Sequence, residues 1–161
     1  MIRLNKLVRA PRQRVFDAWT HGDQIVQWWG VNMEGCTTKA RVDPRLGGEL
    51  RVEMDMPQGK MTGVGVFTAF DPPNRLAFSW LWEEEPNFGR DSLVTVELFE
   101  APNPFEDAPA TEIVLTHERL ATPIERSEHF GGWYQMLRAL GFFVRGVDPR
   151  EAMRPAPVAS A

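Results

Sequence analysis

Residues 75–82 read RLAFSWLW, and every second side chain in this stretch is large and apolar. Successive side chains of a β-strand point to opposite faces, so this alternation predicts a strand with one strongly aromatic face. That face is expected to pack against another part of the fold, because burial of apolar surface is the main favourable term in folding. The residues on this face are Leu76, Phe78, Trp80 and Trp82.

The stretches on either side follow the same period of two and are separated by turn sequences. Residues 49–55 alternate Leu50, Val52 and Met54 with charged residues, which predicts a half-buried strand with one wetted face. A strand is also expected over Met61–Phe70, where two glycines indicate a bulge, a bend or a close approach to the backbone. Those glycines are Gly63 and Gly65. Further strands are expected over Ile2–Val8, from about Thr37, over Ser92–Glu100 and over Thr111–Glu118.

Three helices are expected around these strands. Pro11 can open the first, since its missing N–H is harmless in a first turn, and apolar residues at 15–19 follow helical spacing. The second is expected over Asp23–Trp29. The third and longest contains Gly131-Gly132, which cost roughly 1 kcal/mol each relative to alanine and leave bare backbone that another group can approach. Its apolar stripe is Ile124, Phe130, Trp133, Met136, Leu137, Leu140 and Val144.

This order of elements predicts an α+β fold. We expect a curved antiparallel sheet of about six to seven strands wrapped around the long C-terminal helix, with two short helices after the first strand. A strongly curved sheet around a helix would leave a space between the two. The domain is expected to cover residues 1–147. Residues 148–161 contain three prolines and few apolar side chains, and we expect this tail to be disordered.

The composition excludes several classes of protein. With 161 residues, 43% of them hydrophobic, the chain can form one domain with a core. The net charge of −4 and the absence of a Lys/Arg run argue against binding to nucleic acid. Cys36 is the only cysteine, which excludes an intramolecular disulfide and suits a reducing cytoplasm. No stretch reaches the roughly 18 apolar residues of a membrane span, and the charged N-terminal residues do not form a signal peptide. We therefore expect a cytoplasmic protein with neither a membrane nor a nucleic-acid partner.

The order and spacing of several short motifs resemble those of the START/Bet v 1-like (SRPBCC) superfamily. Within it, the chain resembles the family named after the activator of the ninety-kilodalton heat-shock protein's ATPase (AHSA-like). The resemblance implies a helix-grip fold with an internal cavity. It also implies a role like that of family members, which bind apolar molecules, bind a chaperone or, in a few cases, catalyse reactions. The motifs are Val8-Arg9-Ala10-Pro11, residues 15–19, Trp28-Trp29-Gly30, residues 43–48, residues 65–76, Leu115-Thr116-His117 and Gly131-Gly132-Trp133.

Aromatic side chains are the main candidates for a ligand site. Adjacent helical residues point about 100° apart, so Trp28 and Trp29 are not expected to enter one core easily. One ring is expected in the core while the other caps the open end of the fold, or both belong to a cavity mouth. Trp80 is the best candidate for a cavity wall, facing Trp133 and Leu137. The candidate ligand-binding residues are Trp28, Trp29, Val52, Met54, Phe78, Trp80, Trp82, His117, Trp133 and Leu137.

His117 is the most informative polar candidate. It follows Ile113 and Leu115 in phase, which predicts that it points inward. Two interpretations stay open: a hydrogen-bonded core group, or a polar anchor with weak acid–base capacity near neutral pH. His21 and His129 are far from it in sequence, so no three-histidine metal site is expected. No cofactor motif, paired-carboxylate site or G-x-S-x-G nucleophile elbow is present.

Three functions compete on this sequence. The leading hypothesis is a non-enzymatic protein that binds a small apolar or amphipathic molecule between the sheet and the long helix. The alternative is a protein-interaction module that binds a chaperone or another protein. The third is an enzyme such as a cyclase or hydratase that uses the same cavity, with catalytic residues unknown. Binding is favoured over catalysis. A homodimer is compatible with this fold, and no cofactor or metal is expected.

Overall fold

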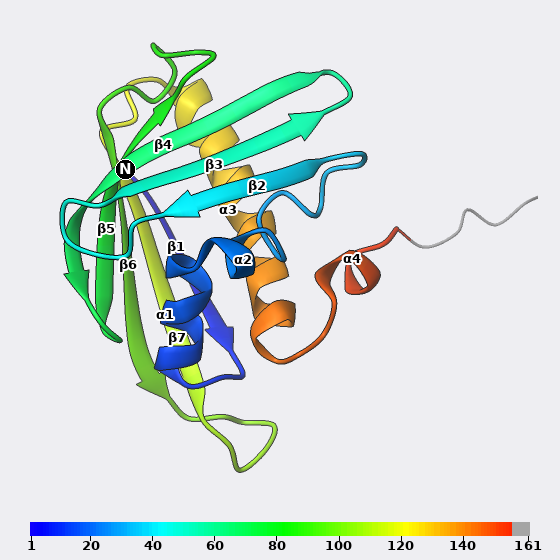
Figure 1. Ribbon diagram of the computed structural model, residues 1–161. Helices are drawn as coiled ribbons and strands as arrows, with labels where there is room; N and C mark the ends of the chain where they lie inside the picture. Colours follow the sequence, from blue (N-terminus) through cyan, green and yellow to red (C-terminus); the bar gives the residue numbers. More distant parts are fainter. Residues whose placement is uncertain (156–161) are drawn as a thin grey trace, which may run out of the picture.

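The chain forms one seven-stranded antiparallel sheet with all helices on one side of it (Figure 1). The computed structural model describes residues 1–155. The strand order is β1-β7-β6-β5-β4-β3-β2, so only β1 lies out of sequence order. The elements are β1 (Ile2–Val8), α1 (Arg12–Thr20), α2 (Gly22–Ile25), β2 (Thr37–Val42), β3 (Glu49–Met56), β4 (Gly59–Asp71), β5 (Arg75–Trp82), β6 (Ser92–Ala101), β7 (Ala110–Glu118), α3 (Pro123–Val144) and α4 (Pro149–Ala152).

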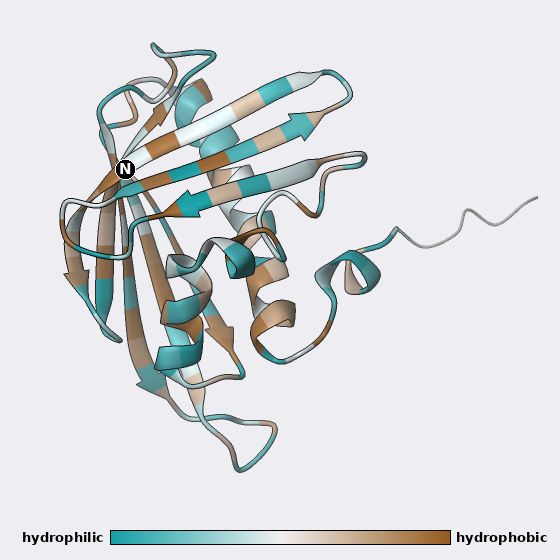
Figure 2. Ribbon diagram, in the orientation of Figure 1, coloured by the Kyte–Doolittle hydropathy of each residue, from teal (hydrophilic) through white to brown (hydrophobic). Residues whose placement is uncertain are grey.

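Strand β5, whose alternating sequence predicted one aromatic face, lies near the middle of the sheet. Strand β5 pairs with β4 and β6, and its four alternating apolar residues are buried, as predicted. Strand β3 shows the alternation in Figure 2, with Leu50, Val52 and Met54 buried between hydrophilic neighbours. The predicted α+β helix-grip fold is confirmed, because the curved sheet packs its inner face against α3.

The two glycines of β4 are places of close approach, as predicted. A Cβ at Gly63 would collide with ring carbons of Trp80, so that indole covers the bare backbone of β4. A Cβ at Gly65 would collide with the carbonyl oxygen of Ser79 on the neighbouring strand. The β4–β5 register shifts between Phe67 and Ala69, which is the irregularity expected of a bulged, bent strand.

The segment after α1 differs from the sequence prediction. The helix expected over Asp23–Trp29 ends at Ile25, and the chain continues in turns to Gly30, whose φ is +77°. The expectation that Trp28 and Trp29 would not share one core is wrong, because both are 0% exposed. Both indoles pack against Trp19, with ring centroids 4.8 Å and 6.1 Å from it. The Trp28 Nε1–H donates to the Ala18 carbonyl at 3.0 Å, and the Trp29 backbone N–H donates to Ile25 O at 2.9 Å.

Helix α3 begins at a complete capping box. The Thr122 side chain accepts from the Glu125 backbone N–H, and the Glu125 side chain accepts from the Thr122 N–H. From Trp133 onward the predicted apolar stripe is buried. The first two turns differ, since Ile124 and Phe130 are 67% and 45% exposed. The buried positions there are Glu125 and His129.

The C-terminal tail is ordered where the structure describes it. Residues expected to be disordered from 148 onward form the short helix α4, which packs against α3 and buries Pro149. The Asp148 side chain caps α4 by accepting from the Arg150 N–H at 2.9 Å. The capping carboxylate and the helix-opening proline favour this short helix. Residues 156–161 of the expected tail lie outside the described part of the chain.

Candidate ligand-binding site

A hollow of about 140 Å³ lies between the sheet and the N-terminal half of α3. Its walls come from β4, β5, α3, the segment after α2 and the loop joining β5 to β6 (residues 83–91). It therefore opens at the place where the curved sheet and the helix do not close on each other. The lining residues are Trp29, Met61, Trp80, Trp82, Phe88, Glu128, His129, Gly132, Trp133 and Met136.

Four indole rings form the inner wall, and each contacts at least one other. The Trp80 ring centroid lies 5.7 Å from that of Trp29, 5.1 Å from that of Trp82 and 6.1 Å from that of Trp133. Trp29 and Trp133 meet edge to face at 5.4 Å. These separations are those of favourable aromatic pairs. Because Gly63 has no side chain, the outer edge of the Trp80 ring can approach the backbone of β4.

Two buried histidines lie behind the indoles, each bonded to one of them. The Trp133 Nε1–H donates to His117 Nδ1 at 3.0 Å, and the Trp82 Nε1–H donates to His129 Nε2 at 3.0 Å. Each accepting nitrogen must be unprotonated, so His117 carries its proton on Nε2 and His129 on Nδ1. These protons are donated to Ser92 Oγ at 2.8 Å and to the Glu125 carbonyl at 2.7 Å.

Both histidines are therefore neutral at physiological pH. Burial, then the neighbouring His129 and the N-terminal amine, lower the pKa of His117 to about 3. Burial also lowers the pKa of His129, although the Glu125 carbonyl opposes that effect. The two imidazoles meet edge to face with centroids 4.9 Å apart. Only His129 reaches the hollow; His117 is 0% exposed and lies one layer behind it.

The loop of residues 83–91 forms one rim and is attached to α3. The Gly89 N–H donates to Glu125 Oε1 at 2.9 Å, and this bond, followed by the one from Thr122, lowers the pKa of Glu125. The Phe88 ring stacks on His129 with centroids 5.1 Å apart. Gly89 has a φ of +69°, and a Cβ there would lie 3.1 Å from the His129 ring. The loop thus holds Phe88 over the edge of the hollow.

Helix α3 forms another part of the rim with bare backbone at Gly132. Among residues 1–155, apart from the chain neighbours and the nearby helix backbone, no atom lies within 4 Å of the position a Cβ would take at Gly132 or at Gly131. Only Gly132 lines the hollow. The predicted close approach to this backbone is not made by any residue among 1–155. Gly132 instead keeps the mouth of the hollow wide.

The structure brings together four of the ten predicted binding residues. Trp29, Trp80, Trp82 and Trp133 line the hollow. The predicted pairing of Trp80 with Trp133 is observed, whereas Leu137 lines a different surface hollow, on the other side of α3. The remaining predicted residues are buried in the core away from the hollow: Trp28, Val52, Met54, Phe78 and His117.

Six lining residues were not among the predicted binding residues. His129 could have been predicted as a lining residue, because it lies four residues before Trp133 and so on the same helix face. Phe88 and Met61 come from a loop and a strand end, where periodicity gives no orientation. The six are Met61, Phe88, Glu128, His129, Gly132 and Met136.

Two polar groups of the inner wall have no protein partner. The Nε1 atoms of Trp29 and Trp80 are buried without a hydrogen-bond acceptor among residues 1–155. Trp19, which contacts Trp29, has a third such group. An unsatisfied buried donor costs about 1–3 kcal/mol. Within the same residues, no three His, Cys, Asp or Glu side chains are grouped so as to hold a metal ion.

Comparison with protein families gives a match over most of the chain. Residues 9–144 match the family described as "Activator of Hsp90 ATPase homolog 1-like protein" (AHSA1). The chain belongs to the AHSA1 family. All of the hollow's lining residues fall inside the matched AHSA1 region, and so does all of α3. No curated protein is similar enough to match.

Solved structures of AHSA1-like proteins share this fold. A protein from Chromobacterium violaceum is 25% identical, with a TM-score of 0.70 over 89% of this chain and 95% of that one. An AHSA1 protein from Silicibacter pomeroyi is also 25% identical, with a TM-score of 0.70 over 89% and 96%. An HSP90 activator from Plasmodium falciparum is 18% identical, with a TM-score of 0.66 over 89% and 95%, and shows likeness of fold alone. No helix among residues 1–155 is long and apolar enough to cross a membrane.

Proposed function

We propose that this AHSA1 protein binds a small, mainly apolar molecule in the tryptophan-lined hollow. The observation that supports this most directly is the open space beside Trp80 and Trp133, at the mouth of which α3 carries Gly132. Concave, apolar sites with a few polar groups are typical of small-molecule binding. The family and the fold support a binding module at this coarse level.

The size of the hollow limits the ligand to about one ring. A volume of about 140 Å³ is well below the ~300–1,000 Å³ of sites for drug-sized ligands. It is close to the ~150 Å³ of an engineered apolar cavity that binds benzene. We therefore propose that a single aromatic or aliphatic ring enters the hollow, and that any larger part of the molecule stays at the mouth.

The unpartnered N–H groups of Trp29 and Trp80 lie within the wall of the hollow and not at its surface, because both nitrogens are inaccessible to solvent. The hollow therefore offers a ligand mainly apolar contact with its aromatic side chains. Acid–base catalysis has less support. The nitrogens of His117 and His129 are all engaged in hydrogen bonds, and both pKa values are lowered.

A matched pair of ligands tests the proposal. Acetophenone and isopropylbenzene have nearly the same shape, but only acetophenone has an acceptor oxygen. In an NMR titration both should shift signals of the tryptophan side chains, and the two should bind with similar affinity, because the buried indole N–H groups cannot reach the acceptor oxygen. The proposal fails if neither ligand shifts the indole signals at about 10 mM, where a site of millimolar affinity would be largely filled.

The two helix glycines supply a control for the location. Gly132→Leu should place a side chain into the mouth and abolish the shifts, whereas Gly131→Leu should leave them in place. Both substitutions replace a glycine with a good helix former, so both proteins should be at least as stable as the original. Equal effects of the two substitutions on binding would place the ligand elsewhere.

A protein-interaction role is the second candidate, supported by the family description and by exposed apolar side chains on α3. Ile124, Phe130 and Tyr134 are 67%, 45% and 55% exposed. Large exposed apolar side chains can mark a docking surface. Measuring the ATPase rate of an Hsp90-type chaperone with and without this protein tests the role directly. Stimulation lost on Phe130→Ser, but kept in Gly132→Leu, would favour this candidate over ligand binding.

A further inference from the structure

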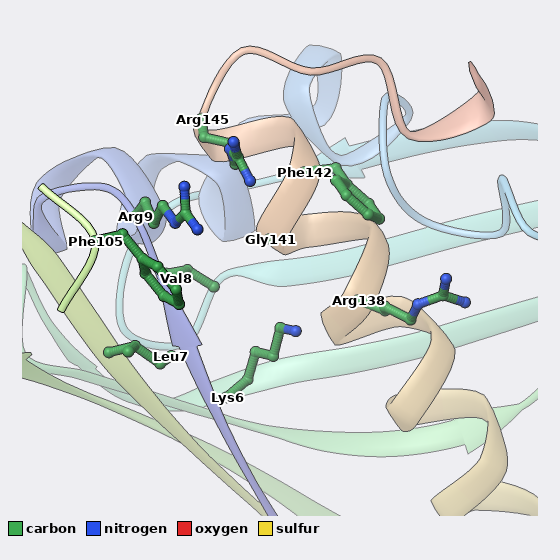
Figure 3. A pocket seen from close by; sticks show the side chains of 9 residues that line it. All are labelled: Lys6, Leu7, Val8, Arg9, Phe105, Arg138, Gly141, Phe142 and Arg145. Carbon is green, nitrogen blue, oxygen red and sulfur yellow. The ribbon is translucent and has the colours of Figure 1, made fainter. Parts of the chain in front are cut away.

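A second opening lies along the seam between β1 and the C-terminal half of α3, and its charge differs from that of the molecule (Figure 3). It has a volume of about 240 Å³. Lys6 and Arg9 line it from β1 and the residue after it, and Arg138 and Arg145 line it from α3 and its C-cap, with the Arg138 guanidinium turned away from the other three cations. No Asp or Glu among residues 1–155 lines it, although the chain's net charge is −4. We name this opening the basic groove.

The four cations of the basic groove have no anionic partner. None of them takes part in an ion pair or a side-chain hydrogen bond with any described residue. Six basic side chains elsewhere among residues 1–155 form ion pairs, as in the contact of Lys60 with Glu53 at 2.8 Å, whereas others, such as Arg3 and Arg75, do not. Four like charges in one groove repel each other, and a bound anion would relieve that repulsion.

The C-terminal end of α3 explains the position of only one of the four cations of the basic groove. Arg145 is the C-cap residue of α3, where the partial negative charge of the helix terminus favours a cation. Lys6 belongs to a different element, and Arg9 follows it. Gly141 brings α3 close to β1, since a Cβ there would lie 3.3 Å from Lys6 Cε and 3.5 Å from Val8 Cγ1. The half-buried Lys6 stem is thereby packed between strand and helix, and its ammonium is held at the groove.

The basic groove also has apolar walls. The Arg9 guanidinium lies over the Phe105 ring with its carbon 3.9 Å from the ring centroid, although Phe105 itself is 67% exposed. Phe142 of α3 lines another side. A neighbouring hollow of about 170 Å³ shares Lys6 and Arg138 and continues toward Tyr134. A molecule with a charged head and an apolar part therefore fits better than a bare inorganic ion.

We propose that the basic groove binds a phosphate monoester with a small apolar or aromatic substituent. A phosphate monoester carries close to two negative charges at neutral pH and three strong acceptor oxygens. Arginine forks can bind two of those oxygens at once, and a lysine ammonium adds a compact charge. The substituent packs on Phe105 or Phe142. The site shares no lining residue with the tryptophan-lined hollow. A test of this site is therefore independent of a test of the proposed function.

An NMR titration with three probes tests this site. Phenyl phosphate should shift the backbone signals of residues 6–9 and 138–145. Inorganic phosphate should shift the same signals but bind more weakly, because it lacks the ring, and phenol should leave them unchanged. Binding of phenyl phosphate should weaken as salt is added, since the charges are exposed to solvent. Absence of any shift at these residues with about 10 mM phenyl phosphate would overturn the proposal.

Charge-removing variants locate the phosphate. Arg138→Gln changes an exposed side chain and should weaken phenyl phosphate binding about tenfold, the effect of losing one hydrogen bond to a charged group. Lys6→Gln should do the same. Arg3→Gln is the matched control, because Arg3 is an exposed cation on the same strand that does not line the groove. If Arg3→Gln weakens phenyl phosphate binding by the same factor, binding depends on general charge attraction, and the proposed site is contradicted.

The phosphate could belong to a free ester or to a lipid headgroup. Sedimentation with vesicles of equal parts phosphatidylcholine and phosphatidic acid separates the two sources. If the protein sediments with these vesicles and Arg138→Gln does not, the site is supported and a lipid headgroup supplies the phosphate. Retention in solution, together with phenyl phosphate binding, supports it with free esters. Sedimentation unchanged in both Arg138→Gln and Lys6→Gln, without phenyl phosphate binding, counts against it.

Discussion

Two indole N–H groups determine the state of both buried histidines. Each indole can only donate, so the imidazole nitrogen that it meets must be an acceptor. The second nitrogen of each ring then carries the proton and has its own acceptor, Ser92 for His117 and a helix carbonyl for His129. Neutral imidazole is thus required by the hydrogen-bond pattern and favoured by burial. The same bonds hold Trp82 and Trp133 in place as walls of the hollow.

Gly63 should tolerate no side chain while Trp80 is present. Gly63→Ala places a methyl group into the Trp80 ring, and overpacking of this kind costs about 1–3 kcal/mol of unfolding free energy. Urea unfolding measures the loss. Adding Trp80→Leu removes the ring, so the double variant should show a smaller penalty for the alanine than the single variant does. Equal penalties in both backgrounds would show that Trp80 is not the obstacle.

Single residues also show what sequence could and could not predict about the site. Trp80 and Trp82 were predictable because strand alternation fixes the face on which a side chain lies. Trp29 was predicted as a candidate, but its full burial depends on turns after Ile25 that helical spacing does not describe. The contact between His117 and His129 arises only when β7 and α3 pack together. No spacing along the chain indicates it.

At the scale of elements, α3 combines two different surfaces. Its C-terminal half follows the predicted apolar stripe, with Leu137 and Leu140 buried. Its first two turns bury Glu125 and His129 instead, because both bind the 83–91 loop or its neighbours. Hydrophobic periodicity identifies the first kind of surface and misses the second, since a buried charged residue looks like an exposed one in sequence. The helix was therefore predictable in length and less so in orientation at its start.

Alanine in place of either glycine of α3 should stabilise the helix. Gly131→Ala and Gly132→Ala each remove a glycine from a helix interior and should raise the unfolding free energy by up to about 1 kcal/mol. Both methyl groups have free space. Thermal unfolding should therefore shift upward in both variants. A lower melting temperature for either one would contradict the open space seen at these positions.

Glu125 should couple the helix start to the 83–91 loop. Glu125→Gln replaces charged acceptors of the Gly89 and Thr122 N–H groups with a weaker, neutral one, and we expect a loss of about 1–2 kcal/mol. Hydrogen exchange at Gly89 should become faster in this variant than exchange in the β6–β7 ladder. Glu128→Gln, one turn of helix away and exposed, is the matched control and should leave Gly89 unchanged. Equal exchange at Gly89 in all three proteins would argue against the attachment.

For the whole molecule, the curved sheet leaves two separate openings along one helix. The tryptophan-lined hollow lies at the N-terminal half of α3, and the basic groove lies at its C-terminal half. Family and fold were predictable from motif order, because strands, turns and the long helix follow one another in a characteristic sequence. The basic groove was not predictable, since its cations are separated by more than 120 residues in the chain and meet only through the β1–α3 contact.

Acid should destabilise the whole protein from near pH 6.5 downward. The folded-state pKa of His117 lies at about 3, below its unfolded value, so the unfolded chain takes up protons first as the pH falls. His129 acts in the same direction, and Glu125, whose pKa is also lowered, adds to the loss below about pH 4.5. His117 alone should remove roughly 3 kcal/mol of unfolding free energy between pH 7 and pH 4.5. Urea unfolding across this range measures the slope, and NMR signals of the His117 ring should show no titration above pH 5. A stability that stays level from pH 7 to pH 5, or a His117 ring that titrates near neutrality, would mean that the indole–imidazole bonds do not hold in solution.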